Sequence, residues 1–239
     1  MLTAIALTPS APVLVPELAG AAATEVAGFR AAALAAAATL PDRWIAVGVG
    51  PADAVIEPDV RGSFAGYGAD VGVALSPAAG PDLHAPDPQA LPLCALFAGW
   101  LRGQVNPQAR VQVRVYAADH SPDTAIACGR ALRAEIDTAA EPIGVLVIAD
   151  GANTLTQSAP GGYDPGAEDS QARLDDALAA GDSDALTRLP DCVIGRVAYQ
   201  VLAGLVPAPV SRKNGATEIL RGAPYGVGYF VGTWNPRPQ

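Results

Sequence analysis

An uninterrupted run of apolar residues at 143–149 constrains the fold of this chain more than any other segment. A strand without polar alternation is buried on both faces, which is typical of parallel or mixed sheets covered by helices. Strand and helix patterns alternate on both sides of this run. The sequence therefore predicts an α/β fold with a central mixed or mostly parallel sheet and helices on both faces. No linker-like segment divides the chain, so we expect residues 1–239 to form a single domain.

The other expected elements follow from apolar periodicity and turn residues. Ser121 is a suitable N-cap for a helix that begins at Pro122 and runs to Thr138. Residues 111–116 alternate between apolar and polar side chains, as a half-exposed strand does. We expect further strands at 2–7, 44–49, 71–75, 217–220 and 226–233, a loop at 80–88, and further helices at 17–39, 92–104, 167–180, 183–189 and 192–205.

The charge and composition of the chain exclude some classes of partner. The formal net charge is −9 and no run of Lys or Arg offsets it, so phosphate backbones would be repelled and nucleic acid is not expected as a partner. The longest apolar stretch, residues 31–40, is too short to span a bilayer, and no signal peptide is evident, so no membrane partner is expected. Three cysteines lie far apart and do not indicate a disulfide framework. These features predict a cytoplasmic protein.

Four loops follow the expected strands and are candidates for a binding site. Ligands in open α/β sheets bind beyond the carboxyl ends of the strands, and these ends converge if the strands are parallel. Here the loops are residues 8–16, 48–53, 117–121 and 150–164. The Gly-Val-Gly at 48–50 lacks the third glycine and the helix start of a dinucleotide-binding fingerprint, so it is weak evidence for a nucleotide.

Few residues suit a metal centre or a nucleophile. The chain has two histidines, His84 and His120, and no HxxxH, CxxC or HxD spacing. His120 follows a strand, where it can either face the pocket or pair with a neighbouring carboxylate. Cys192 precedes an expected helix, where its thiol can either have a lowered pKa or simply pack against its neighbours.

Three motifs suggest a family. The first is Pro9-Ser10-Ala11-Pro12 with Val15-Pro16-Glu17, the second is the Ala-Pro-Gly-Gly-Tyr-Asp-Pro at 159–165, and the third is the Pro-Tyr-Gly-Val-Gly-Tyr at 224–229. In this order, over nearly the whole chain, they resemble the class III extradiol ring-cleavage dioxygenases of the LigB type. The resemblance implies an α/β fold and, in the family, a non-haem Fe(II) centre that cleaves catechol-type rings.

The chain departs from the family at the residues that carry its chemistry. Ser10, Gly50 and Asn153 stand where the resemblance implies histidines. Asp150 matches the family aspartate, and Glu218 is the nearest candidate for the carboxylate ligand of the iron. Asn153 can form a hydrogen bond with a substrate oxygen, but an amide cannot shuttle a proton at neutral pH.

These departures favour a LigB-like pseudoenzyme for which no metal and no cofactor is predicted. It would bind a small aromatic or polar ligand or form part of an oligomer, including a homo-oligomer. Two alternatives stay open: an active enzyme that uses His120, Glu218, Asp150 or Cys192, and a ferrous ring-cleavage dioxygenase with other ligands. The candidate pocket residues are Ser10, Gly50, His120, Asp150, Asn153, Glu218 and Tyr225.

Overall fold

The computed structural model describes residues 1–79, 90–207 and 215–236, and the expected loop at 80–88, with His84, lies outside these ranges. A seven-stranded sheet forms the centre, in the order β3-β6-β2-β7-β1-β9-β8. β4 and β5 form a separate two-stranded sheet. The strands are β1 (Leu2–Thr8), β2 (Arg43–Gly50), β3 (Ala54–Ile56), β4 (Arg61–Ser63), β5 (Gly72–Ala74), β6 (Arg110–Ala117), β7 (Ile143–Ile148), β8 (Ala216–Gly222) and β9 (Tyr229–Trp234).

The central sheet has a parallel core with antiparallel edges. β7 pairs in parallel with both β1 and β2, and β2 pairs in parallel with β6. At the edges, β3 runs antiparallel to β6, β9 to β1, and β8 to β9. The predicted mixed, mostly parallel α/β sheet is confirmed.

The burial of the strands matches the sequence patterns that predicted them. Every residue of β7 is buried, as its continuous apolar run requires. Along β6, buried residues alternate with more exposed ones. Val111, Val113 and Val115 therefore face one hydrophobic cluster, while the polar residues between them face the other side of the sheet.

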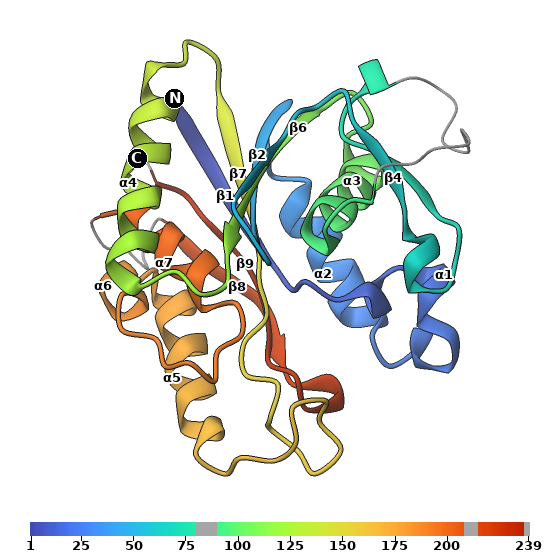
Figure 1. Cartoon of the computed structure of the whole chain (residues 1–239), viewed down its shortest axis with the longest axis vertical. Coiled ribbons are helices and arrows are strands. Elements are labelled where there is room, and N and C mark those ends of the chain that lie inside the picture. Colours follow the sequence, from blue (N-terminus) through green and yellow to red (C-terminus); the bar gives the residue numbers. More distant parts are fainter. Residues whose placement is uncertain (80–89, 208–214, 237–239) are drawn as a thin grey trace.

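Helices cover both faces of the sheet (Figure 1). On one face, α2 (Ala27–Ala37) contacts β1, β8 and β9, and α3 (Leu93–Val105) contacts β2 and β6. On the other face lie α4 (Pro122–Thr138), α5 (Ala167–Ala180), α6 (Ser183–Leu186) and α7 (Arg196–Leu205). As predicted, the Ser121 hydroxyl caps α4 by accepting a hydrogen bond from the Thr124 N–H. In the described ranges no helix combines the length and apolarity needed to cross a bilayer.

The single helix expected at 17–39 is wrong. The segment is divided into α1 (Pro16–Ala19), a 3₁₀ turn at Gly20–Ala23 and α2. Gly20 has a φ of +50°, a conformation that favours glycine and that ends a right-handed helix. The alanine-rich composition favoured a continuous helix, but the glycine interrupts it.

The helix expected at 192–205 also begins later than predicted, at Arg196. The backbone before it pairs with the loop that follows β7: Val193 forms a β-bridge with Ala152, and the Gly195 N–H donates to the Asp150 carbonyl at 2.9 Å. Because these backbone groups already pair with the loop, they are not available for the hydrogen bonds within a helix. The strand expected from 226 likewise starts at Tyr229, because Pro224–Gly226 forms a 3₁₀ turn.

Two glycines let α4 and α7 approach closely. A Cβ atom added to Gly129 of α4 would lie 2.0 Å from the Val201 carbonyl oxygen, and one added to Gly204 of α7 would lie 2.1 Å from the Ile126 carbonyl oxygen. Both contacts are with backbone, which cannot rotate away as a flexible side chain can. The crossing of these two helices therefore requires glycine at both positions.

We predict that Gly129→Ala and Gly204→Ala each lower the free energy of unfolding by more than about 2 kcal/mol, because the helices must move apart in a packed core. Gly103→Ala in α3 is the matched control, since an added Cβ there meets no atom within 4 Å. Higher helix propensity should make that variant more stable by ~0.5–1 kcal/mol. Chemical denaturation monitored by circular dichroism measures all three. Equal effects at the three positions would contradict the close crossing.

Candidate functional site

The carboxyl ends of the four parallel strands lie at one edge of the sheet, with the long loop after β7 (Figure 1, lower part). The candidate residues at this edge form two groups. One joins the ends of β1 and β7 and contains Ser10 and Asp150. The other joins the ends of β2 and β6 and contains Gly50 and His120. The four strand ends thus share one edge of the sheet, and these contacts join their loops in two pairs.

Asp150 is the central residue of the first group. The Ser10 N–H donates to Asp150 Oδ1 at 2.8 Å, which ties the loop after β1 to the loop after β7. Desolvation raises the pKa of the Asp150 carboxyl to about 7, although the Ser10 hydrogen bond acts in the opposite direction. This carboxyl therefore gains and loses its proton near neutral pH. Ser10 supplies its backbone N–H here, a role that any residue except proline could fill.

Two tyrosines lie within electrostatic reach of Asp150. The buried Tyr199 hydroxyl donates to the Ala149 carbonyl at 2.9 Å. Burial, and then the negative charge of Asp150, raise the pKa of both Tyr199 and Tyr229. Both phenols consequently stay protonated at physiological pH and can donate hydrogen bonds.

The loop after β7 is held by the C-terminal motif. The Gly151 N–H donates to the Gly228 carbonyl at 2.8 Å, and the Gly228 N–H donates to the Ala152 carbonyl at 2.8 Å. Gln171 of α5 accepts from the Ala152 N–H at 2.8 Å. An added Cβ on Gly228 would lie 2.1 Å from the Gln171 amide oxygen, so a side chain there would displace Gln171 from its hydrogen bond with Ala152. The C-terminal motif at 224–229 is thus in direct contact with the loop that follows β7.

Asn153 and Tyr225 lie in this same region. Asn153 is half-buried, and its main-chain carbonyl accepts a hydrogen bond from the Gly161 N–H at 3.0 Å. Tyr225 has a φ of +58°, within the left-handed region that a tyrosine rarely adopts, and its hydroxyl donates to Glu25 at 2.5 Å. Non-glycine residues held in such conformations concentrate at functional sites.

In the second group, His120 pairs with a carboxylate that the sequence reasoning missed. His120 Nε2 lies 2.7 Å and 3.0 Å from the two Asp53 carboxylate oxygens. The Ala117 N–H also donates to Asp53, at 2.7 Å, and these contacts lower the pKa of Asp53. Gly50 accepts from the Ala118 N–H through its carbonyl at 3.0 Å. Asp53 lies in a loop that follows a strand, and this position is the sequence signal that could have identified it as a site residue.

Neither Glu218 nor Cys192 shares a hydrogen bond with either group among the described residues, although Val193, next to Cys192, forms a bridge with Ala152. Glu218, on β8, pairs with Arg221 at 2.9 Å, and Arg221 also binds Asp176 of α5 at 2.8 Å. Cys192 is half-buried and packs against the hydrophobic cluster under α4 and α7. Asp150, His120 and Glu218 therefore each have a different partner.

The described residues do not fit the ferrous centre that the family resemblance implies. Within residues 1–79, 90–207 and 215–236, no group of three His, Cys, Asp or Glu side chains is arranged to hold a metal ion. At the carboxyl edge, Ser10 offers a hydroxyl and Gly50 offers no side chain, and neither is a good ligand for ferrous iron. His120 already binds Asp53.

Two cavities lie away from Asp150. One, of about 760 Å³, is a groove near the amino ends of β2 and β6. The other, of about 710 Å³, lies between α5 and α6. Neither of the two includes a residue of the candidate site.

Comparisons with known proteins address the fold. No family model matches the chain, and no curated protein matches it. Among solved structures, the chain is similar to that titled as the crystal structure of uncharacterized protein JW3007 from Escherichia coli K12. The TM-score is 0.56 at 13% identity, with 97% of this chain and 98% of the other covered. At this identity the likeness shows a shared fold and leaves function open.

The pKa of Asp150 predicts how stability depends on pH. In the unfolded chain this carboxyl has an ordinary pKa of 3.8, whereas in the folded protein its pKa is about 7. The folded state thus binds the proton more tightly, and its stability falls as pH rises from the first value to the second. Asp150→Asn should remove this loss and be more stable than wild type by ~2–4 kcal/mol near pH 8, with little difference near pH 4.

Asp53→Asn is the control, because the contribution of Asp53 to stability changes with pH in the opposite direction. The pKa of Asp53 is lowered by folding, so its contribution is present at neutral pH and is lost as pH falls through the folded value. Denaturation curves from pH 8 down to below the ordinary Asp pKa of 3.8 measure both variants. If Asp150→Asn left the slope of stability against pH unchanged, the carboxyl would have an ordinary pKa.

Proposed function

We propose that this chain is a LigB-like protein without an iron centre, which binds a small aromatic or polar molecule beside Asp150 at the carboxyl edge of the sheet. The observation that carries the proposal is the Asp150 carboxyl itself, which accepts from the Ser10 N–H at 2.8 Å and has a pKa of about 7. A desolvated carboxyl at the carboxyl end of a central strand is characteristic of binding and catalytic sites.

The surroundings of Asp150 suit a ligand with hydroxyl or carbonyl groups. The Tyr199 hydroxyl proton is already donated to the Ala149 carbonyl, whereas Tyr229 keeps its proton and Asp150 in its neutral form can itself donate a hydrogen bond. Thr8, the last residue of β1, has a buried hydroxyl without a hydrogen-bond partner among the described residues. An unsatisfied buried hydroxyl is costly, and a water molecule or a ligand can satisfy it.

The side chains at the positions of the family's iron ligands support a role other than ferrous ring cleavage. Family histidines are replaced by Ser10, Gly50 and Asn153 on the alignment of the motifs, and Glu218 is engaged with Arg221 on an edge strand. The acidic composition supports a cytoplasmic protein that does not bind nucleic acid.

A metal-free acid–base enzyme is the second candidate, and one observation favours it. A general acid or base works best when its pKa is near the working pH, and the pKa of Asp150 is about 7. Binding and catalysis by Asp150 differ in one respect: only catalysis converts the bound molecule. The same experiment can therefore test both.

Catechol is a suitable probe for the proposed site. We expect catechol added to metal-free protein to shift the amide resonances of Ser10 and Gly151 in a saturable manner, and its affinity to change with pH around the pKa of Asp150. Asp150→Asn should remove the pH dependence, whereas Asp184→Asn, an exposed carboxylate on α6, should retain it. Nuclear magnetic resonance titration measures the affinity and detects any product.

Two results would overturn the proposal. The first is the absence of saturable shifts at Ser10 and Gly151 with catechol and with other small phenols or hydroxy acids. The second is stoichiometric Fe(II) retained after anaerobic reconstitution, lost in His120→Ala and accompanied by ring cleavage. That result would restore the dioxygenase hypothesis.

A further inference from the structure

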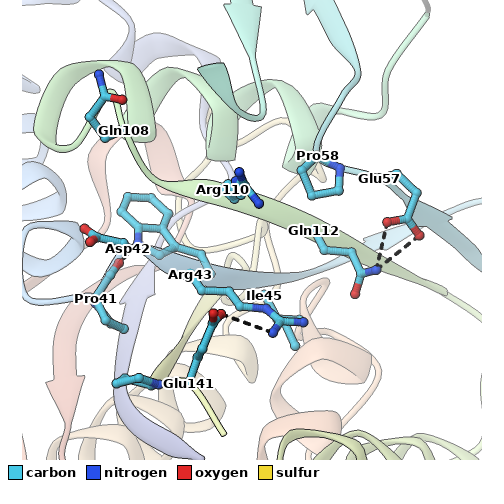
Figure 2. A pocket seen from close by; sticks show the side chains of 12 residues that line it. Pro41, Asp42, Arg43, Ile45, Glu57, Pro58, Gln108, Arg110, Gln112 and Glu141 are labelled. Carbon is cyan, nitrogen blue, oxygen red and sulfur yellow. Dashed lines mark hydrogen bonds and ion pairs between the residues drawn. The ribbon is translucent and has the colours of Figure 1, made fainter. Parts of the chain in front are cut away.

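The groove near the amino ends of the strands carries a second inference, at the edge of the sheet opposite Asp150. Its floor is formed by the first residues of β2 and β6, and Glu57 and Glu141 lie at its two sides (Figure 2). Its volume of about 760 Å³ falls in the range that holds small organic ligands. Ile45 and nearby prolines supply apolar surface among the charged side chains.

Two arginines are neighbours on this floor. Arg43 of β2 and Arg110 of β6 are paired in register on adjacent parallel strands. Arg43 lies two residues before Ile45 on β2, so the two side chains project from the same face of the sheet. Arg110 is the register partner of Arg43 and projects from that face as well. Like charges directly opposite each other across two strands destabilise a sheet. An anion between the two guanidinium groups would offset this repulsion.

Two of the three acidic residues that line the groove accept hydrogen bonds from neutral amides, and the third, Glu141, pairs with Arg43. Glu57 accepts hydrogen bonds from Gln112 with both carboxylate oxygens at 3.1 Å, and Asp42 accepts from Asn106 at 2.8 Å. Glu141 reaches Arg43 at 3.6 Å, a long contact between exposed side chains. The Arg110 guanidinium has no ion pair or side-chain hydrogen bond with the other residues that line the groove (Figure 2). A free arginine beside a second arginine is notable in a chain of net charge −9.

We propose that this groove binds the oxyanion of a small organic acid or phosphate ester between Arg43 and Arg110. A guanidinium group presents its N–H donors in a planar fork that matches the two oxygens of a carboxylate or phosphate. The apolar surface of Ile45 and the prolines would contact the body of the ligand. Binding would displace only the long Arg43–Glu141 contact. The site shares no residue with the candidate site at Asp150, so either proposal can fail alone.

Isothermal titration calorimetry with benzoate and with inorganic phosphate tests the proposal on the whole chain at low ionic strength. We expect Arg110→Gln to weaken binding at least about tenfold, because it removes the unpaired fork. Glu141→Gln should tighten binding several-fold, because Arg43 loses its competing carboxylate. Arg188→Gln is the matched control, with the same change of charge at the other cavity, and it should bind as wild type does.

The two probes separate the sources of the oxyanion. Tighter binding of benzoate would support an organic acid that uses the apolar surface, and tighter binding of phosphate would support a phosphate ester. No saturable binding of either at millimolar concentration would overturn the proposal. So would equal affinity in wild type and Arg110→Gln, or a loss confined to Arg188→Gln, which would place the anion between α5 and α6. Unchanged circular dichroism would show that each variant is folded.

Discussion

The parallel pairing of β7 on both sides is the interaction on which the rest of the structure depends. β7 pairs with β1 along its whole length and with β2 from Gly144 to Val147, and all six of its residues are buried. A strand in this position must be covered on both faces, so α2 and α3 pack on one side and α4 to α7 on the other. It also aligns its neighbours in the same direction, which brings their carboxyl ends to one edge.

The two edges of the sheet differ in chemistry as a consequence. At the carboxyl edge, the loops after β1 and β7 enclose a carboxyl whose pKa desolvation raises to about 7, near the buried Tyr229. At the amino edge, exposed arginines begin β2 and β6 in register, beside acids that bind other groups. We propose a neutral polar ligand for the first environment and an oxyanion held by two arginines for the second.

Local patterns predicted most of the fold. The apolar run at β7, the alternation along β6 and the Ser121 cap of α4 each correspond to an observed element, because each depends on neighbouring residues alone. Where prediction failed, a contact from elsewhere in the chain or a single backbone conformation was responsible. The backbone before α7 is used by the loop after β7, and Gly20 adopts a positive φ within an alanine-rich segment. The short strands β3 and β4 carry too few residues to show a period.

The sequence by itself determined the α/β class, the order of most elements and the loops that meet at the carboxyl edge, since these follow from periodicity and from the geometry of parallel strands. It also named Asp150 and Ser10. Only the tertiary structure decided which partner each polar group has. Asp150 accepts from the Ser10 N–H, and His120 contacts Asp53. Glu218 pairs with Arg221, and Arg43 lies beside Arg110. The physical reason is that pKa values and ion pairs depend on burial and on distances between residues far apart in the chain.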